Sequence, residues 1–214
     1  MESVFKLLVC VAALLCVGCE CGDTMLYNNK TYTIQGIPNA ITLSNRVDVI
    51  VDKTLPIDQI YTSTNYNNFN RLTIEVIDGI LHIDAINTLL GNERYLVYIP
   101  SLAYRSIKTI DGSDFTWEEC NSDTLTIESA GGSDLTIKGT IRQLNIKASG
   151  GSDIDCGEFN AEDVTIVASG GSDINVVANK TLSLTASGGS DIHIIGNPQI
   201  LLWDVSESSD VEFN

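Results

Sequence analysis

Apolar and polar residues alternate along the second half of the chain at fixed distances from a repeated Gly-Ser-Asp motif. Aliphatic or aromatic residues stand one and three positions after the Asp of each copy, with Cys156 the one exception, and again seven and nine positions before it, with Arg105 the one exception. Because alternate residues of a strand face the same side, this pattern predicts two half-buried strands in each repeat. In the last repeat the predicted inward positions are Leu201, Trp203, Val211 and Phe213.

The motif recurs with Asp-to-Asp spacings of 20, 19, 20, 18 and 19 residues. Such a period is typical of one coil of a solenoid, in which each strand pairs with its counterpart in the next coil about 4.8 Å away. We therefore predict an all-β fold, a right-handed parallel β-helix with about 19 residues per coil, whose handedness follows the general chirality of parallel crossovers. A corner of the coil needs glycine, which adopts positive φ without steric cost. The predicted corner residues are Gly132, Ser133, Asp134, Gly151, Ser152, Asp153, Gly171, Ser172, Asp173, Gly189, Ser190 and Asp191.

Residues 25–106 lack the motif but alternate in a similar way, for example at Leu72–Val76 and Ile80–Ile83. At the same period this segment has room for about four more coils, which would give roughly ten in the whole chain. The alternative is an irregular β cap, and we expect this part to be more irregular than the rest. Residues 31–214 are predicted to form a single β-helical domain that ends in a polar coil, since an uncovered coil is an open sheet edge.

The first 18 residues have the pattern of a secretion signal, with an unbroken apolar run from Leu7 to Val17. The run is much shorter than the roughly 20 apolar residues of a membrane-spanning helix. A small residue precedes Cys19, as in the lipobox of bacterial lipoproteins, so we expect lipidation of Cys19 and a tether over residues 19–30. Simple secretion, with cleavage near Gly18 or Cys21, is the alternative. The first reading predicts an outer-membrane or cell-surface protein held to the bilayer by its lipid, and the second a periplasmic or secreted one.

Acidic residues outnumber basic ones by 28 to 12, which gives a formal net charge of −16. This balance argues against nucleic acid as a partner, because polyanions are attracted to Lys and Arg. Hydrophobic residues make up 43% of the chain, enough to bury a core.

Several segments together resemble one bacterial family. They are TYTIQGIPNAITLS, VDVIVD, LTIEVIDGILHIDA, YLVYIPSL and the serial SGGSDI. Over residues 31–206 the chain is similar to the family called putative auto-transporter adhesin, head GIN domain, whose members are β-helical proteins of Gram-negative envelopes. The resemblance implies an adhesin-like role without enzymatic activity, and it supplies no catalytic residue.

The Asp of each motif copy is expected to stack in one column, with neighbouring carboxylates about 5 Å apart. Unit charges at this distance repel by roughly 1 kcal/mol in water, and by more at a lower dielectric constant. One interpretation is a turn role in which Ser and Asp cap backbone amides while the carboxylates stay solvated. The other is Ca²⁺ bound between coils, since calcium favours carboxylate oxygens. The column consists of Asp114, Asp134, Asp153, Asp173 and Asp191, with Asp210 in a degenerate last copy.

Two cysteines, Cys120 and Cys156, lie in the repeat region. They belong to coils about 10 Å apart, too far for a disulfide, so we predict that they are not bonded to each other and that Cys156 faces inward. His82 and His193 are expected to be outward-facing strand residues. Tyrosines of the N-terminal half form either a glycan-binding surface or part of the core: Tyr61, Tyr66, Tyr95, Tyr98 and Tyr104.

The repetition favours a non-enzymatic envelope module that presents an extended acidic surface to a glycan or a surface protein. A carbohydrate-cleaving β-helix enzyme is an alternative, but it needs a cluster of acids that breaks the repeat on one face. A purely structural or sensory envelope component is the third reading. No catalytic residue and no cofactor other than calcium is predicted.

Overall fold

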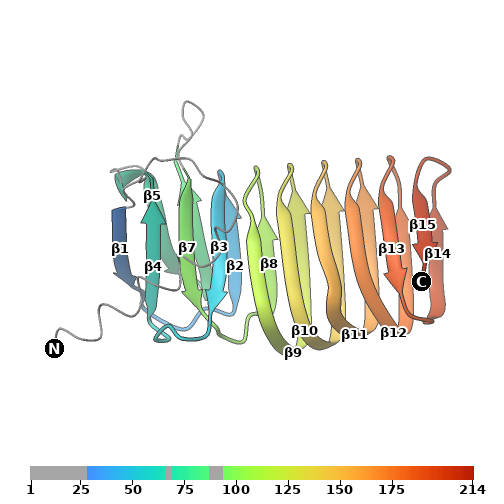
Figure 1. Ribbon diagram of the computed structural model, residues 1–214, viewed down its shortest axis with the longest axis horizontal. Helices are drawn as coiled ribbons and strands as arrows, with labels where there is room; N and C mark the ends of the chain where they lie inside the picture. The colour runs from blue at the N-terminus through green and yellow to red at the C-terminus, as the bar shows by residue number, and fades with distance from the viewer. Residues whose placement is uncertain (1–27, 66–68, 87–93) are drawn as a thin grey trace, which may run out of the picture.

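The computed structural model describes residues 28–65, 69–86 and 94–214. Its strands form two facing layers that extend along one axis, with β1 at one end and β14 and β15 at the other (Figure 1). All of these strands are hydrogen-bonded into one continuous sheet, and the described residues contain no α-helix. The elements are β1 (Asn28–Thr33), β2 (Ala40–Ser44), β3 (Val47–Asp52), β4 (Gln59–Thr64), the 3-10 helix η1 (Phe69–Arg71), β5 (Leu72–Ile77), β6 (Ile80–Ala85), β7 (Tyr95–Pro100), β8 (Ser106–Thr109), β9 (Phe115–Ala130), β10 (Asp134–Ser149), β11 (Asp153–Ser169), β12 (Asp173–Ala186), β13 (Asp191–Ile195), β14 (Gln199–Val205) and β15 (Asp210–Phe213). Strand β1 thus begins within the range predicted as a tether.

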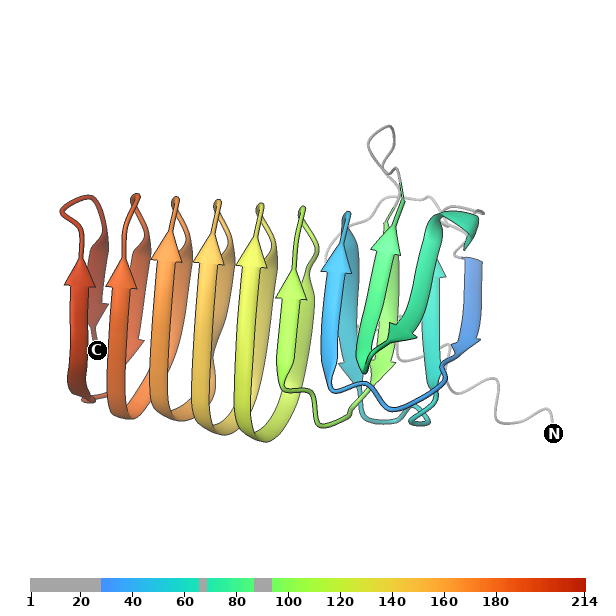
Figure 2. The ribbon, with the colours of Figure 1, turned by 180° about the vertical axis from the view of Figure 1, so that it is seen from behind.

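The long strands β9 to β12 form the regular part of the molecule. Each runs along one layer, bends, and continues along the other layer, so that narrow turns follow one edge and broad bends follow the opposite edge (Figures 1 and 2). Neighbouring strands are parallel and in register, with Leu135 opposite Phe115 on one side and Ile154 on the other. The predicted parallel β-solenoid is confirmed, with about five turns whose coils are roughly 20 residues apart.

The N-terminal strands do not stack in the order of the chain. One layer has the order β1-β4-β7-β3-β9, and the pairs β1·β4, β4·β7 and β5·β6 are antiparallel. Strand β3 lies directly against β9, with Val49 opposite Phe115. The expectation of four further sequential coils is therefore wrong. Short turns such as Asp78-Gly79 reverse the chain into hairpins here, and the structure has the irregular β cap instead.

The core lies between the two layers and is built from the predicted inward columns. Phe115, Ile137, Cys156, Val176 and Ile194 are all at most 4% exposed, as are their neighbours in the facing layer. One column after another stacks along the axis, so that a coil is buried by the coils on either side of it.

The last coil departs from the expectation in two ways. Ile200, not Leu201, is opposite the buried Leu182, because the register shifts at this point, and Leu201 is 61% exposed. Trp203 does occupy the inward column, opposite Leu184, but it is 47% exposed because no coil of the described residues covers it. The polar end expected for the terminal coil is therefore wrong.

Candidate functional site

Tight turns at one edge of the solenoid place the repeated motif. In the turn before β11, Gly150 and Gly151 have φ of 71° and 73°, a pair of left-handed residues that closes the chain within two positions. Ser152 then points inward and is fully buried, and its hydroxyl donates to the carbonyl oxygen of Ser149 at 2.9 Å. Asp153 follows and is exposed on the outer face.

The serines of the motif copies form a buried column inside this edge. The Ser113 amide donates to the Ser133 hydroxyl at 3.2 Å, and the Ser190 amide donates to the Ser209 hydroxyl at 3.3 Å, which ties consecutive turns together. The hydroxyls thus satisfy backbone groups at the corner, and the aspartates remain on the outside. The members are Ser113, Ser133, Ser152, Ser172, Ser190 and Ser209.

The aspartates stack on the outer face as one ladder. Asp153 is in register with Asp134 on one side and Asp173 on the other, and the pairing continues through Asp191 to Asp210. At the spacing of neighbouring strands, consecutive carboxylates lie about 5 Å apart.

A seventh acid, Asp48 of β3, extends this aspartate ladder and was missed by the sequence reasoning. Val49 is in register with Phe115, which places Asp48 opposite Asp114. The turn before it is of the same kind, with Asn45 and Arg46 at φ of 63° and 64° in the place of the two glycines. The spacing from this Asn-Arg pair to Asp48 equals that from Gly-Gly to Asp, and it is the signal that could have found this residue. The aspartate ladder is defined as Asp48, Asp114, Asp134, Asp153, Asp173, Asp191 and Asp210.

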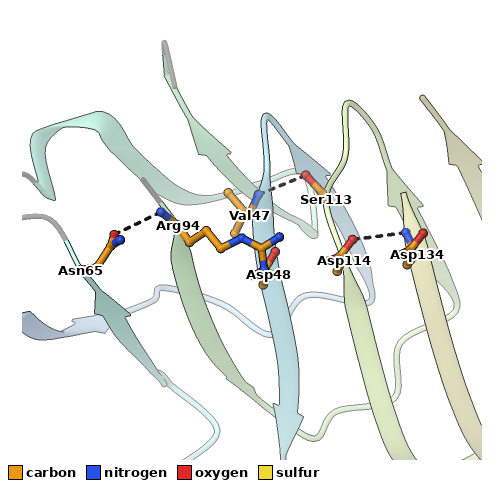
Figure 3. Close-up of polar contacts among 7 residues, drawn as sticks. All are labelled: Val47, Asp48, Asn65, Arg94, Ser113, Asp114 and Asp134. Atoms are coloured by element: carbon orange, nitrogen blue, oxygen red, sulfur yellow. Dashed lines mark hydrogen bonds and ion pairs between the residues drawn. The ribbon is translucent and has the colours of Figure 1, made fainter. Parts of the chain in front are cut away.

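The electrostatics differ along the ladder. Burial raises the pKa of Asp48 to about 6, against the opposing effect of the nearby Arg94 guanidinium, whose Nη1 lies 3.3 Å from the Asp48 carboxylate. Partial burial, and then the charge of Asp114, raise the pKa of Asp134 as well. The Asp134 amide also donates to the Asp114 carboxylate at 3.3 Å (Figure 3). The two ends of the ladder therefore differ, since among the described residues an ion pair with a basic side chain is formed at the Asp48 end.

Beside the ladder runs a second outward column, and the two together line a shallow groove of about 620 Å³. Its side chains are linked by hydrogen bonds, since Asn175 donates to Asp155 at 3.0 Å and contacts His193 Nδ1 at 3.2 Å. His193 also contacts the Asn214 amide through Nε2. His193 is thus half-buried on the outer face, as is His82.

The calcium candidates lie in the aspartate ladder, one from each strand. Within the described segments there is no group of three or more His, Cys, Asp or Glu side chains arranged to share a metal ion. A calcium ion between coils would have to take its remaining ligands from water or from the ligand that binds there.

The two cysteines of the repeat region are both free and buried, so the prediction that they are not bonded to each other is confirmed. Cys156 faces inward as expected and is 0% exposed. Burial raises the pKa of the Cys120 thiol to about 12 and raises that of Cys156 as well. Neither thiol is thereby activated for chemistry.

The tyrosines do not gather on one exposed face. Tyr95 and Tyr104 are fully buried, and the hydroxyl of Tyr104 donates to the carbonyl oxygen of Pro100 at 2.9 Å. Tyr61 and Tyr98 are half-buried and pack against each other, with ring centroids 5.8 Å apart.

Tyr66, the signal segment 1–18 and Cys19 lie outside the described residues. No helix in the described part of the chain is long and apolar enough to cross a bilayer.

Comparison with known families gives a match over residues 38–198 to the family described as "Putative auto-transporter adhesin, head GIN domain". The chain belongs to this family. A search of functionally curated proteins found no match for this head GIN domain protein.

Solved structures share its fold. A putative adhesin from Bacteroides fragilis superposes with a TM-score of 0.68 at 14% identity, over 88% of this chain and 97% of the other. A putative adhesin from Parabacteroides merdae has a TM-score of 0.56 at 18% identity, over 88% and 96%. A putative lipid binding protein from Parabacteroides distasonis has a TM-score of 0.54 at 17% identity, again over 88% and 96%. The family and these structures are named for adhesion or binding and not for catalysis, and an adhesin family indicates an exported or cell-surface protein.

Proposed function

We propose that this head GIN domain protein is a non-enzymatic binding protein of the cell envelope, attached to the outer membrane or cell surface by lipid on Cys19. The short apolar run before Cys19 supports export and anchoring, and so does the family's description as adhesins. The tethered domain presents its strand faces to the surroundings of the cell.

The aspartate ladder carries the proposal. Seven carboxylates, six of them on strands and Asp114 directly before β9, lie in one line, and along most of its length a groove accompanies it. A flat face with charges at intervals of about 5 Å suits an extended ligand that repeats its own groups, such as a glycan chain or a strand-like segment of a surface protein. The negative charge favours ligands with cationic groups, such as amino sugars or lysine-rich segments, or ligands that bind through bridging calcium.

The regular repetition of the ladder carboxylates argues against an enzyme. Cleavage of a glycosidic bond needs two carboxyl groups with opposite roles at one place, whereas the ladder offers similar neighbours at every step. A structural or sensory component without a ligand of its own remains the competing function, and the binding assay separates the two.

The test uses purified residues 24–214 on a glycan array and on an array of lysine-rich peptides, each with 2 mM calcium and with chelator (roughly the millimolar affinity of extracellular calcium sites). The ladder variant Asp153→Asn/Asp173→Asn/Asp191→Asn removes three charges from the groove. The control variant Glu118→Gln/Glu158→Gln/Glu162→Gln removes three charges near the bends, where these residues pair with Lys138 and Lys180.

We expect binding that the ladder variant loses at least tenfold and the control variant keeps. Binding only in calcium would assign the metal-bridged mode. A protein that binds nothing on either array, or whose binding survives the ladder variant, contradicts the proposed surface.

Anchoring is tested separately. Cys19→Ser should release the protein from the membrane fraction and abolish incorporation of radiolabelled palmitate. Protease shaving of intact cells then tells whether the domain is outside the outer membrane. A Cys19→Ser protein that still fractionates with membranes would overturn the lipid anchor.

A further inference from the structure

The C-terminal end of the solenoid exposes apolar side chains that the rest of the molecule keeps inside. Trp203 and Phe213 occupy the inward columns, yet they are 47% and 45% exposed because the coil that would cover them does not exist within the described residues. Their rings stack on each other, with centroids 5.8 Å apart and planes 22° apart. Ile200, opposite the buried Leu182, is the third inward side chain, while Leu201 is the extra residue at the register shift and Leu202 lies on the outer face, opposite Ser183. The C-terminal end patch is defined as Ile200, Leu201, Trp203 and Phe213.

The same end has two open sheet edges. Strands β14 and β15 lie last in their layers (Figures 1 and 2), and their strand partners in the described part of the chain are β12 and β13 alone. Neither strand contains Lys or Pro, the residues that commonly protect an edge from pairing. The backbone groups that point away from β12 and β13 are therefore available to another strand.

At the opposite end, one of the two edge strands is protected. Lys30 lies in the edge strand β1 and places its ammonium group 4.2 Å from the centre of the Tyr32 ring and 5.9 Å from that of Phe69. A charged side chain over the end aromatics covers apolar surface and discourages strand addition. Strand β5, the other edge strand at that end, pairs with β6 alone and also lacks Lys and Pro. Within the described residues, the C-terminal end differs because neither of its edge strands carries a lysine and two half-exposed aromatic rings stack between them.

We propose that the C-terminal end patch is a self-association surface, on which a second copy of the chain docks end to end. A ligand that satisfies both edges must itself present two strand edges at the separation of the two layers, with an apolar centre between them. The C-terminal end of a second copy has this shape. A two-fold axis perpendicular to the solenoid makes the facing edge strands antiparallel, the arrangement in which short strands pair most readily, and brings Trp203 and Phe213 of the two copies together.

The area of the C-terminal end patch limits how strongly two copies can associate. The four side chains of the C-terminal end patch expose roughly 400 Å² per copy, and with the edge backbones a dimer buries about 1,000 Å² in total, the lower limit of specific interfaces. Acidic residues surround the patch, among them Asp204, Asp210 and Glu212, so like charges oppose the contact. We therefore expect a weak dimer that salt strengthens, in contrast to an association driven by ion pairs.

Combined with the proposed anchoring through the N-terminus, this geometry has a consequence for adhesion. The described chain begins with β1, at the end of the solenoid opposite the docking surface, so two proteins joined end to end direct their N-terminal ends away from each other and can sit on two facing membranes. This consequence depends on the proposed function, whereas self-association in solution does not.

Sedimentation velocity of residues 24–214 between 10 and 500 µM (roughly the range of weak, transient interfaces) tests the proposal, at low salt and in 0.5 M NaCl. The end variant Leu201→Asp/Trp203→Ser alters the patch. The control variant Ile57→Asp/Ile77→Ser makes the same kind of change at two exposed isoleucines, 58% and 48% accessible, away from the C-terminal end. Circular dichroism and the melting temperature verify that each variant is folded.

We expect a monomer–dimer equilibrium that tightens in salt, is weakened at least tenfold in the end variant, and is unchanged in the control. A spin label at Glu207→Cys should broaden NMR signals of β14 and β15 in an unlabelled copy. A protein that stays monomeric at 500 µM in 0.5 M NaCl, open-ended growth beyond the dimer, or a dimer that survives the end variant each overturns the proposal. Ladder binding on the arrays is read separately, so failure here leaves the proposed function standing, and the reverse holds too.

Discussion

Gly139 lies at the bend of β10, where the strand passes from one layer to the other, and its environment leaves no room for a side chain. Its φ is 125°, and it is in register with Cys120 of the preceding coil. A Cβ atom at this position would stand 2.0 Å from the Cys120 carbonyl oxygen and 2.9 Å from the carbonyl carbon and amide nitrogen of the same residue. All three atoms are backbone, so no rotamer change relieves the overlap.

The cost of Gly139→Ala follows from two effects. The backbone conformation alone disfavours an L residue by about 1–2 kcal/mol. Restoring a normal contact requires β9 and β10 to separate by about 1 Å, which weakens one or two ladder hydrogen bonds at about 1 kcal/mol each and loosens packing beside them. Together these give about 2–4 kcal/mol, which corresponds to a fall of roughly 10 °C in the melting temperature of a chain of this size.

Gly112→Ala is the matched control. Gly112 also has positive φ, 74°, but the nearest atoms to its Cβ would be 3.8 Å away. It should therefore pay the conformational cost alone, about 1–2 kcal/mol. Urea unfolding followed by circular dichroism measures both variants against the unaltered protein. If Gly139→Ala costs no more than Gly112→Ala, the close approach of the two coils at the bend is refuted.

Other predictions follow from the charges and thiols. Because burial raises the pKa of Asp48 to about 6, the folded protein holds a proton between about pH 4 and 6 that the unfolded chain releases, and stability through this group falls as the pH rises. Asp48→Asn should therefore raise the free energy of unfolding by about 1–2 kcal/mol at pH 7.5, after allowance for the lost ion pair with the exposed Arg94, and should change it little at pH 4. An equal gain at both pH values would contradict this origin of the effect. Asp153→Asn removes a negative charge that lies between two others. It should therefore raise the melting temperature by about 1–3 °C at low ionic strength, and by less in 0.5 M salt. A lower melting temperature of the variant in chelator-treated protein would show instead that the carboxylate is stabilising. Cys120 and Cys156 should react with a thiol reagent only at the rate of unfolding, and rapid labelling of the native protein would contradict their burial.

The repeat region was predictable because its information is local and repeated. Every coil carries its own turn, with glycines where φ is positive and a serine that bonds back to the turn, and its own inward columns, such as Ile137 and Val176. Parallel in-register stacking then follows from the constant period, since any other register would turn apolar columns to solvent.

The N-terminal arrangement could not be read in the same way. Strand β3 pairs with β9 across more than 60 residues of intervening chain, and β2 and β3 lie between strands that come later in the sequence. No local pattern encodes such an order. Asp48 was missed for the same reason, because its membership of the ladder depends on where β3 lies and its turn uses Asn45 and Arg46 in place of glycine.

The end of the solenoid shows a different limit. The inward pattern continues through Trp203 and Phe213, but burial requires a further coil, and the sequence pattern alone does not tell whether one follows. The one-residue register shift before Leu202 then moved Leu201 out of the column in which the spacing had placed it.

The line of seven carboxylates depends on β3 lying next to β9, and a distance between spin labels tests this most directly. Labels on residues 24–214 are placed at Lys53→Cys, directly after β3, and at Glu212→Cys in β15. These two strands lie in the layer that runs β3-β9-β10-β11-β12-β13-β15, six strand spacings apart. The account predicts a mean separation of about 30 Å by pulsed electron paramagnetic resonance. Coils stacked in chain order would separate the same residues by about eight spacings, near 40 Å, and a distribution centred there would contradict the continuous ladder.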